Sequence, residues 1–346
     1  MATERDRAAT GDLSGAVHAV LPALERFLAF DGADPARRRS AWRARLDLGL
    51  PAEGIGRDAV LAELAEWVVG NGLRTGHPGF CGWVTTMPTA VGAAADLAQA
   101  VAVPQRWWAT AGNFVDELAM RWLVELLGFP PGFNGTFTAG GSTANLVGLG
   151  AARQHAGERL GLQPSRDGNA GLVEPRVYCS TEAHHVVGRA LGVLGLGRRS
   201  LREIALDGQG TIDLNLLQAA LDEDAAAGCT PVAIVACAGD VNTGRIDPIA
   251  ELARIAGARG IWLHVDGAYG GWGVLDERVR ARFGDRAPYD SFAIDPHKWL
   301  AAPVGTGAAI VRDAGLLGRA FEVETGAYDK ERQAPIGAGD TASPFD

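Results

Sequence analysis

The segment Ile261–Gly271, with the sequence IWLHVDGAYGG, decides the fold class of this chain. Its apolar run is bounded by glycines and ends in Asp266, a pattern typical of a strand buried on both faces of a parallel sheet. In open α/β sheets, ligands bind where the parallel strands end. Asp266 is therefore expected at a binding site.

A second apolar segment, Ser291–Ile294, leads into Asp-Pro-His and then Lys298, one of only two lysines in the chain. Both segments are expected to end at the same edge of the sheet, which brings Lys298 and Asp266 to one pocket. Pyridoxal phosphate needs such a pair, because a lysine holds its aldehyde and a carboxylate keeps its ring nitrogen protonated. The alternative is an ordinary salt bridge of small energetic value.

A glycine-rich turn, AGGSTAN, opens a predicted helix within the segment that starts at Thr136. Glycines let the backbone approach an anion, and free N–H groups at a helix start bind phosphate oxygens together with hydroxyls such as those of Ser142 and Thr143. The alternative is an ordinary helix cap.

A further motif follows the predicted strand Arg176–Ser180, where His184 precedes a predicted helix over Val186–Leu196. A histidine at such a junction can lay its ring on a flat cofactor. The alternative is a capping or core histidine.

Taken in order, the motifs GGSTAN, AHH, HVDGAYGG and DPHKW resemble the group II pyridoxal-phosphate amino-acid decarboxylases, the family of aromatic-amino-acid and glutamate decarboxylases. The resemblance extends to the HPGF segment His77–Phe80 and covers roughly residues 70–320. It implies an α/β fold of the fold-type I pyridoxal-phosphate transferase kind. We expect a mainly parallel sheet with helices on both faces, plus an N-terminal helical arm.

The resemblance also implies roles for single residues. Lys298 would form the Schiff base with pyridoxal 5′-phosphate, and Asp266 would pair with the ring nitrogen. Ala268 would lie against the ring, and His184 would stack on its opposite face. These residues, with Lys298, Asp266 and His184 as the catalytic set, are the predicted centre of the site.

The remaining assignments concern the phosphate and the substrate. Ser142 and Thr143 would hold the phosphate, with His297 nearby, and Trp83 and Thr86 would line the substrate pocket. No metal site is expected.

The implied reaction is decarboxylation of an L-amino acid to an amine and carbon dioxide. An aminotransferase or a carbon–carbon lyase of the same fold is the nearest alternative, but Trp299 and the HPGF segment favour the decarboxylase. A third possibility is a truncated, catalytically incompetent cofactor-binding domain, because relatives carry a mobile loop with a catalytic tyrosine and then a small C-terminal domain, which are expected to be missing here. Tyr328 is not expected to replace that tyrosine. The family's Gly-Thr-Thr is also replaced by Gly239-Asp240-Val241.

Residues 1–75 are predicted to form a helical arm that packs on a partner subunit in a homodimer, and residues 76–346 to form the cofactor domain. The predicted helices and strands are Leu13–Phe30, Pro35–Leu48, Arg57–Gly70, Pro88–Val101, Asn113–Leu127 and strands at 176–180, 232–238, 261–266, 291–294 and 308–312, with a loop-like stretch at 157–172.

Composition narrows the function classes. A net charge of −9 argues against a nucleic-acid partner. The four cysteines lack the spacing of a zinc site or a disulfide framework and are expected to be free thiols. No signal peptide or membrane-spanning run is apparent. A soluble cytoplasmic protein acting on a small amino-acid substrate is expected.

Overall fold

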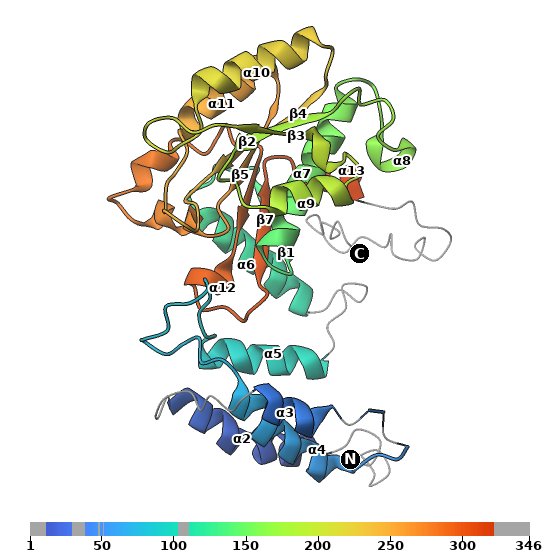
Figure 1. Ribbon diagram of the computed structural model, residues 1–346, viewed down its shortest axis with the longest axis vertical. Coiled ribbons are helices and arrows are strands. Elements are labelled where there is room, and N and C mark those ends of the chain that lie inside the picture. The colour runs from blue at the N-terminus through green and yellow to red at the C-terminus, as the bar shows by residue number, and fades with distance from the viewer. Residues whose placement is uncertain (1–11, 30–38, 48, 51, 103–110, 322–346) are drawn as a thin grey trace. The chain divides into compact units, whose positions relative to one another are not determined.

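The computed structural model describes residues 12–29, 39–47, 49–50, 52–102 and 111–321. The chain divides into two compact units, Met1–Trp83 and Val84–Asp346, each of which can be followed in Figure 1. Within the described part of the chain, no helix is long and apolar enough to cross a membrane.

The first unit is helical, as predicted. Helices α2 (Leu13–Ala29), α3 (Arg39–Leu46) and α4 (Arg57–Glu63) are followed by a π-helical turn at Leu64–Val68 and a 3₁₀ turn at Val69–Asn71. The predicted helix over 57–70 thus begins where expected but changes type after Glu63. Residues 30, 35–38 and 48 of the predicted helices lie outside the described residues.

Within its described residues, the second unit is built on a sheet of seven strands in the order β1-β7-β6-β5-β4-β2-β3. Strand β7 runs antiparallel to both of its neighbours, and the remaining pairs are parallel, so the predicted mainly parallel sheet is confirmed. In chain order, the strands are Asn134–Thr138, Arg176–Ser180, Leu201–Ile204, Pro231–Cys237, Trp262–Asp266, Ser291–Ile294 and Gly307–Val311.

The register of the central strands positions the site. Cys237 at the end of β4 is paired with Asp266 at the end of β5, which in turn is paired with Ala293 of β6. The three strands therefore end at one edge of the sheet. Their interiors are buried apolar runs, as expected for strands that are covered on both faces.

Two hydrophobic cores cover the two faces of the sheet. One contains buried residues of α6 (Ala111–Leu126), α10 (Leu214–Ala226) and α11 (Ile249–Arg259). The other contains buried residues of α7 (Gly141–Glu158), α9 (Val186–Val193) and α13 (Ala314–Phe321). This arrangement is the layered α/β architecture that the sequence predicted (Figure 1).

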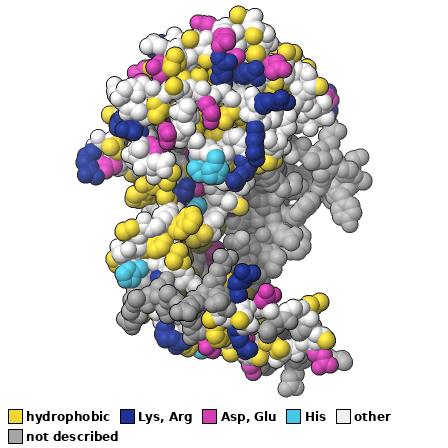
Figure 2. All heavy atoms as spheres, in the orientation of Figure 1, with side chains coloured by type: hydrophobic (Ala, Val, Ile, Leu, Met, Phe, Trp, Pro, Cys, Tyr) yellow, Lys and Arg dark blue, Asp and Glu magenta, His cyan; other side chains and the backbone are white. Residues whose placement is uncertain are grey.

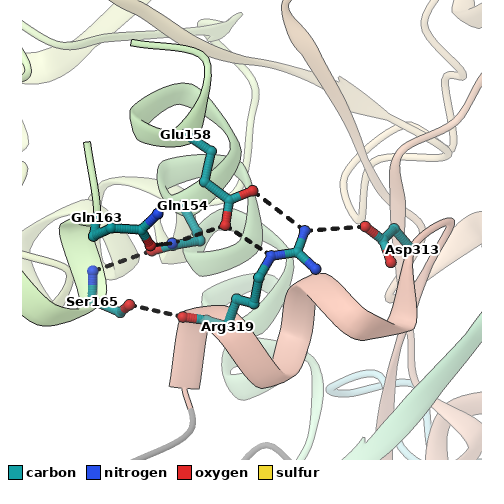
Figure 3. Close-up of polar contacts among 6 residues, drawn as sticks. All are labelled: Gln154, Glu158, Gln163, Ser165, Asp313 and Arg319. Atoms are coloured by element: carbon teal, nitrogen blue, oxygen red, sulfur yellow. Dashed lines mark hydrogen bonds and ion pairs between the residues drawn. The ribbon is translucent and has the colours of Figure 1, made fainter. Parts of the chain in front are cut away.

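The C-terminal end of α7 is tied to α8 (Pro164–Asp167) and α13 by a polar cluster, which we call the α7–α13 clamp (Figure 3). Arg319 Nε donates to Glu158 Oε1 at 2.8 Å, and Ser165 Oγ donates to the Arg319 carbonyl oxygen at 2.7 Å. The clamp comprises six residues: Gln154, Glu158, Gln163, Ser165, Asp313 and Arg319.

The structure adds two strands that the sequence did not reveal, β1 and β3. Strand β1 is a short polar NGTFT segment that the sequence placed in the turn before α7. Gly135 allows its close pairing, since an added Cβ would lie 2.0 Å from the Ala309 carbonyl oxygen. The helix predicted over 186–196 ends at Val193, and the stretch 157–172 contains the short helix α8. Helix α5 spans Ala90–Ala102, close to its predicted bounds.

Candidate active site

A cavity of about 800 Å³ opens at the edge where β4, β5 and β6 end. Its walls come from the segments that follow these strands, from the first turn of α7 and from the junction after β2. Six of the predicted site residues line it: Ser142, His184, Asp266, Ala268, His297 and Lys298.

Asp266 is held in place by the turn that follows β5. The Ala268 N–H donates to Asp266 Oδ1 at 3.1 Å, which fixes the carboxylate against the backbone. Beside this turn, a Cβ on Gly239 would lie 2.7 Å from the Gly270 Cα, so the two loops approach each other at a point where only glycine fits. The carboxylate is thus set rigidly in the cavity wall.

Lys298 lies on the short helix α12 (Pro296–Trp299) that follows β6. Its Nζ is 2.9 Å from Asp295 Oδ2, so the described ion pair joins Lys298 to Asp295 rather than to Asp266. Trp299 Nε1 donates to the Tyr269 carbonyl oxygen at 3.0 Å and joins α12 to the turn after β5. The amine and the carboxylate of Asp266 nevertheless share one cavity, as the sequence predicted.

The start of α7 forms a second wall. Gly140 has φ of 91°, a left-handed conformation that glycine adopts without strain, and its carbonyl accepts from the Thr143 N–H at 3.1 Å. Ser142 lines the cavity, whereas Thr143 is not among its described lining residues. The N-terminus of this 18-residue helix carries the partial positive charge that favours an anion.

His184 lies at the junction between β2 and α9, beside His185, with the two ring centroids 4.1 Å apart. The Val186 N–H donates to His184 Nδ1 at 3.3 Å. Burial, and next the neighbouring His185, lower the pKa of His184 from its ordinary value. Histidine side chains gather beside basic side chains on the face shown in Figure 2.

His297 lines the cavity and is hydrogen-bonded to Thr86 and Thr306. His297 Nδ1 donates to the Thr306 carbonyl oxygen at 2.7 Å, and Thr86 Oγ1 donates to the His297 carbonyl oxygen at 2.9 Å. Thr86 thus contacts the backbone next to Lys298. Trp83 is the last residue of the first unit, with 85% of its surface exposed, and its place in a substrate pocket stays a prediction.

A buried polar network behind Asp266 was not assigned a role from the sequence. His264 Nδ1 is 2.7 Å from Ser291 Oγ, and His264 Nε2 is 2.8 Å from Asn145 Oδ1. Asn145 Nδ2 donates to the Gly141 carbonyl oxygen at 2.8 Å, so the network joins strand β5 to the first turn of α7. Burial lowers the pKa of His264 to about 4. His264 is part of the Ile261–Gly271 segment, but its residue type alone did not predict that its side chain would be buried among Ser291 and Asn145.

Asp240 stands where the resemblance led us to expect a hydroxyl residue. It folds its own loop by accepting from the N–H groups of Asn242 and Thr243 at 2.8 and 2.7 Å and of Arg245 at 3.0 Å. Although burial pushes its pKa upward, hydrogen bonds from Thr243, Arg245 and Asn242 outweigh burial and leave the pKa below the ordinary value. Asp240 is thus a stable anion among the residues that line the cavity.

The model of the pyridoxal-dependent decarboxylase conserved domain matches residues 43–337. An aromatic-L-amino-acid decarboxylase of Bacillus atrophaeus is 34% identical over 284 residues, which are 81% of this chain and 57% of the relative. An L-2,4-diaminobutyrate decarboxylase of Rhizobium meliloti (strain 1021) is 32% identical over 268 residues, which are 76% of this chain and 52% of the relative.

Solved structures give the same result for the fold. The glutamate decarboxylase domain of the diaminobutyrate-pyruvate transaminase and L-2,4-diaminobutyrate decarboxylase from Vibrio parahaemolyticus superposes with a TM-score of 0.83 at 25% identity, covering 92% of this chain and 70% of that one. Oryza sativa TDC with PLP gives 0.79 at 25% identity, covering 88% and 67%. The expected fold-type I architecture is confirmed. The chain spans about half the length of the curated relatives named above.

Proposed function

The chain belongs to the family of pyridoxal-dependent decarboxylases, and from this premise we propose that it removes the carboxyl group of an L-amino acid as carbon dioxide and leaves the amine. The observation that carries the proposal is the joint presence of Lys298 and Asp266 in one cavity, with the start of α7 as a third wall. Pyridoxal 5′-phosphate is the cofactor of this family.

The residues present fit that cofactor. The cavity offers an amine, a carboxylate, an imidazole and a helix N-terminus, which match an aldehyde, a ring nitrogen, a flat ring and a phosphate. The start of α7 has no side chain at Gly141, where a Cβ would lie 2.6 Å from Asp295 Oδ2 and 2.9 Å from the Ala268 Cβ. A side chain at this position would occupy space in the cavity next to the helix N-terminus.

We assign the predicted roles accordingly. Lys298 would bind the aldehyde covalently and Asp266 would face the ring nitrogen. Ala268 and His184 would lie against the two faces of the ring. Ser142, Thr143 and His297 would surround the phosphate, and Trp83 and Thr86 would line the substrate side.

When bound, the cofactor supplies an electron sink for the pair of electrons that departing carbon dioxide leaves behind. The protein's part is to orient and to keep charge in place. The fixed carboxylate of Asp266 would hold a proton on the ring nitrogen, and burial keeps His184 largely neutral at physiological pH, because it lowers the pKa of that imidazole. A neutral ring can stack on the cofactor without adding positive charge.

Two residues of the cavity wall bear on which L-amino acid it accepts. Val84 lines the cavity and favours an apolar side chain, whereas the acidic Asp240, which also lines it, suits a cationic one. The relatives named above include enzymes for aromatic amino acids and for 2,4-diaminobutyrate, and each of these two features fits one of them.

We further propose that the protein is a cytoplasmic homodimer. Residues 1–75 would be the arm that packs on the partner, and residues 76–346 the cofactor domain. Support comes from the apolar side chains that α2 leaves exposed, including Leu21, Leu24 and Leu28. Large exposed apolar groups of this kind mark protein interfaces.

The test is direct. Purified protein is loaded with pyridoxal 5′-phosphate, reduced with borohydride and digested, and the modified peptide is mapped; carbon dioxide and amine are then assayed across the amino acids. We expect a label on Lys298 and one preferred substrate. A label on Lys330 instead of Lys298 contradicts the site. A label on Lys298 without carbon dioxide release would favour a cofactor-binding domain without activity. Release of a keto acid would favour an aminotransferase.

A further inference from the structure

Asp295 has an unusual position for a carboxylate. Its side chain is 2% exposed, and Lys298 Nζ lies 2.9 Å from its Oδ2. Its other oxygen, Oδ1, is buried without a hydrogen-bond partner among the described residues. A buried carboxylate ordinarily has several donors, because leaving one of its oxygens unmatched away from water is destabilising.

Two glycines make the space for this carboxylate. A Cβ on Gly141 would lie 2.6 Å from Asp295 Oδ2, and a Cβ on Gly307 would lie 2.8 Å from Oδ1. The carboxylate therefore sits between the first residue of α7 and the first residue of β7. Its backbone is fixed as well, since Trp272 Nε1 donates to the Asp295 carbonyl oxygen at 2.9 Å.

The contrast with Asp240 shows what such an environment does. Asp240 is also buried, but the N–H groups and a hydroxyl of its own loop hold it as an anion. Asp295 instead has one charged hydrogen-bond partner, Lys298. If Lys298 becomes neutral, the buried carboxylate loses the cation that is paired with it, and its protonated form is favoured.

We propose that Asp295 is the proton acceptor that frees the Lys298 amine for bonding to the aldehyde of the cofactor. An N–H bond of the Lys298 ammonium breaks, an O–H bond forms on Asp295 Oδ2, and the lone pair on Nζ is released. The freed Lys298 amine would then be able to bond to the aldehyde carbon of the cofactor, with its two remaining protons leaving together with the aldehyde oxygen as water. This inference rests on the proposed function of Lys298.

The surrounding charges agree with this role. Among the described residues, the titratable groups that act most strongly on Asp295 are Lys298 and His297 of α12 and Asp266 of β5. Burial raises the pKa of Asp295, while the Lys298 and His297 charges oppose the rise and Asp266 adds to it. The raised pKa of Asp295 favours the protonated carboxyl, which is the direction that this role requires.

The pH dependence of loading separates this role from a structural one. When the proton moves within the pair, the free amine and the protonated carboxyl appear together without exchange with solvent, so their share is independent of pH while the pair as a whole keeps one proton. When the carboxyl is absent, the proton must leave to solvent, and the share of free amine rises about tenfold per pH unit while the amine is mostly protonated.

The experiment follows covalent attachment of pyridoxal 5′-phosphate to the apoprotein by absorbance, at saturating cofactor, from about pH 6 to about pH 8. For the unaltered protein we expect the logarithm of the rate constant to be nearly flat. For Asp295→Asn we expect the logarithm of the rate constant to rise with a slope near one per pH unit. The readout is the difference between the two slopes, because ionisation of the ligand contributes equally to both proteins. Asp290→Asn replaces another buried carboxylate, paired with Arg312 away from the cavity, and is expected to keep the flat profile.

Two outcomes overturn the inference. A slope near one in the unaltered protein, with Lys298 labelled, removes the role from Asp295 and leaves the proposed function intact; this measurement needs no folded variant. Equal flat slopes in the unaltered protein and in Asp295→Asn also remove it. If borohydride labels no Lys298 in the unaltered protein, both the proposed function and this inference are wrong.

Discussion

The two ends of helix α7 differ in how fully their polar groups are matched. At the C-terminal end, the α7–α13 clamp joins Gln154 and Glu158 to neighbours on α8 and α13 (Figure 3). At the N-terminal end, Gly140 and Gly141 open a cavity, and Asp295 next to them keeps an unmatched buried oxygen. We infer from this difference that the C-terminal end of α7 stabilises the fold, whereas the N-terminal end is arranged to bind a ligand.

The largest expected effect is a loss of chemistry at the N-terminal end. Lys298→Arg keeps a positive charge beside Asp295 but removes the amine that can bond to an aldehyde. We expect borohydride labelling and carbon dioxide release to fall to background, with the urea midpoint nearly unchanged. Lys330→Arg is the matched control and should label as the unaltered protein does. Residual labelling in Lys298→Arg would show that the site lies elsewhere.

A loss of stability with a smaller loss of chemistry is expected from the middle of α7. A Cβ on Gly148 would lie 2.5 Å from His264 Cε1, so Gly148→Ala overpacks the network behind Asp266. We expect a loss of about 1–3 kcal/mol in the free energy of unfolding by urea titration. Gly257→Ala in α11 is the control, because nothing lies within 4 Å of its added Cβ, and it should stabilise slightly. Equal effects of the two would contradict the packing argument.

The same network predicts a pH dependence. Burial lowers the pKa of His264 to about 4, against an ordinary value of 6.5, so the unfolded chain takes up a proton first as the pH falls. Its contribution to stability is present above pH 6.5 and is lost as the pH falls toward 4. Between about pH 6.5 and 5 we expect the free energy of unfolding to fall by an amount on the order of 2 kcal/mol. His264→Gln should remove this contribution from the pH dependence. Parallel slopes in urea titrations would speak against this origin.

The smallest effect is expected at the clamp. The hydrogen bond from Arg319 lowers the pKa of Glu158. The contribution of Glu158 to stability is therefore present above its ordinary pKa of 4.5 and is lost as the pH falls through its lowered pKa. Because Arg319 is 48% exposed, Arg319→Met should cost only about 0.5 kcal/mol at neutral pH and less in acid, by urea titration. Unchanged labelling of Lys298 would sharpen the contrast between the two ends, and a change in labelling would remove it.

Much of this arrangement could be predicted from the sequence, for reasons that particular residues make plain. The buried run ending at Asp266 and the short segment before Lys298 are local patterns, and parallel strands bring their ends together whatever the details. The pairing of Lys298 with Asp295 was not predicted, because it depends on how α12 turns after β6. Strand β1 was missed for a similar reason: its polar NGTFT sequence becomes a strand only when β7 pairs with it. The inward direction of His264 depends in turn on the space that Gly148 leaves in α7.

The place of β7 in the sheet has a consequence for how the molecule is made. Strand β1 comes earliest in the sequence among the seven, yet its partner is β7, which comes last. During synthesis, β1 must wait for about 170 residues before its partner leaves the ribosome, and such distant pairing slows folding. A chain interrupted before Gly307 would leave the Asn134–Thr138 edge open to other chains, which makes this interval the one in which aggregation is most expected.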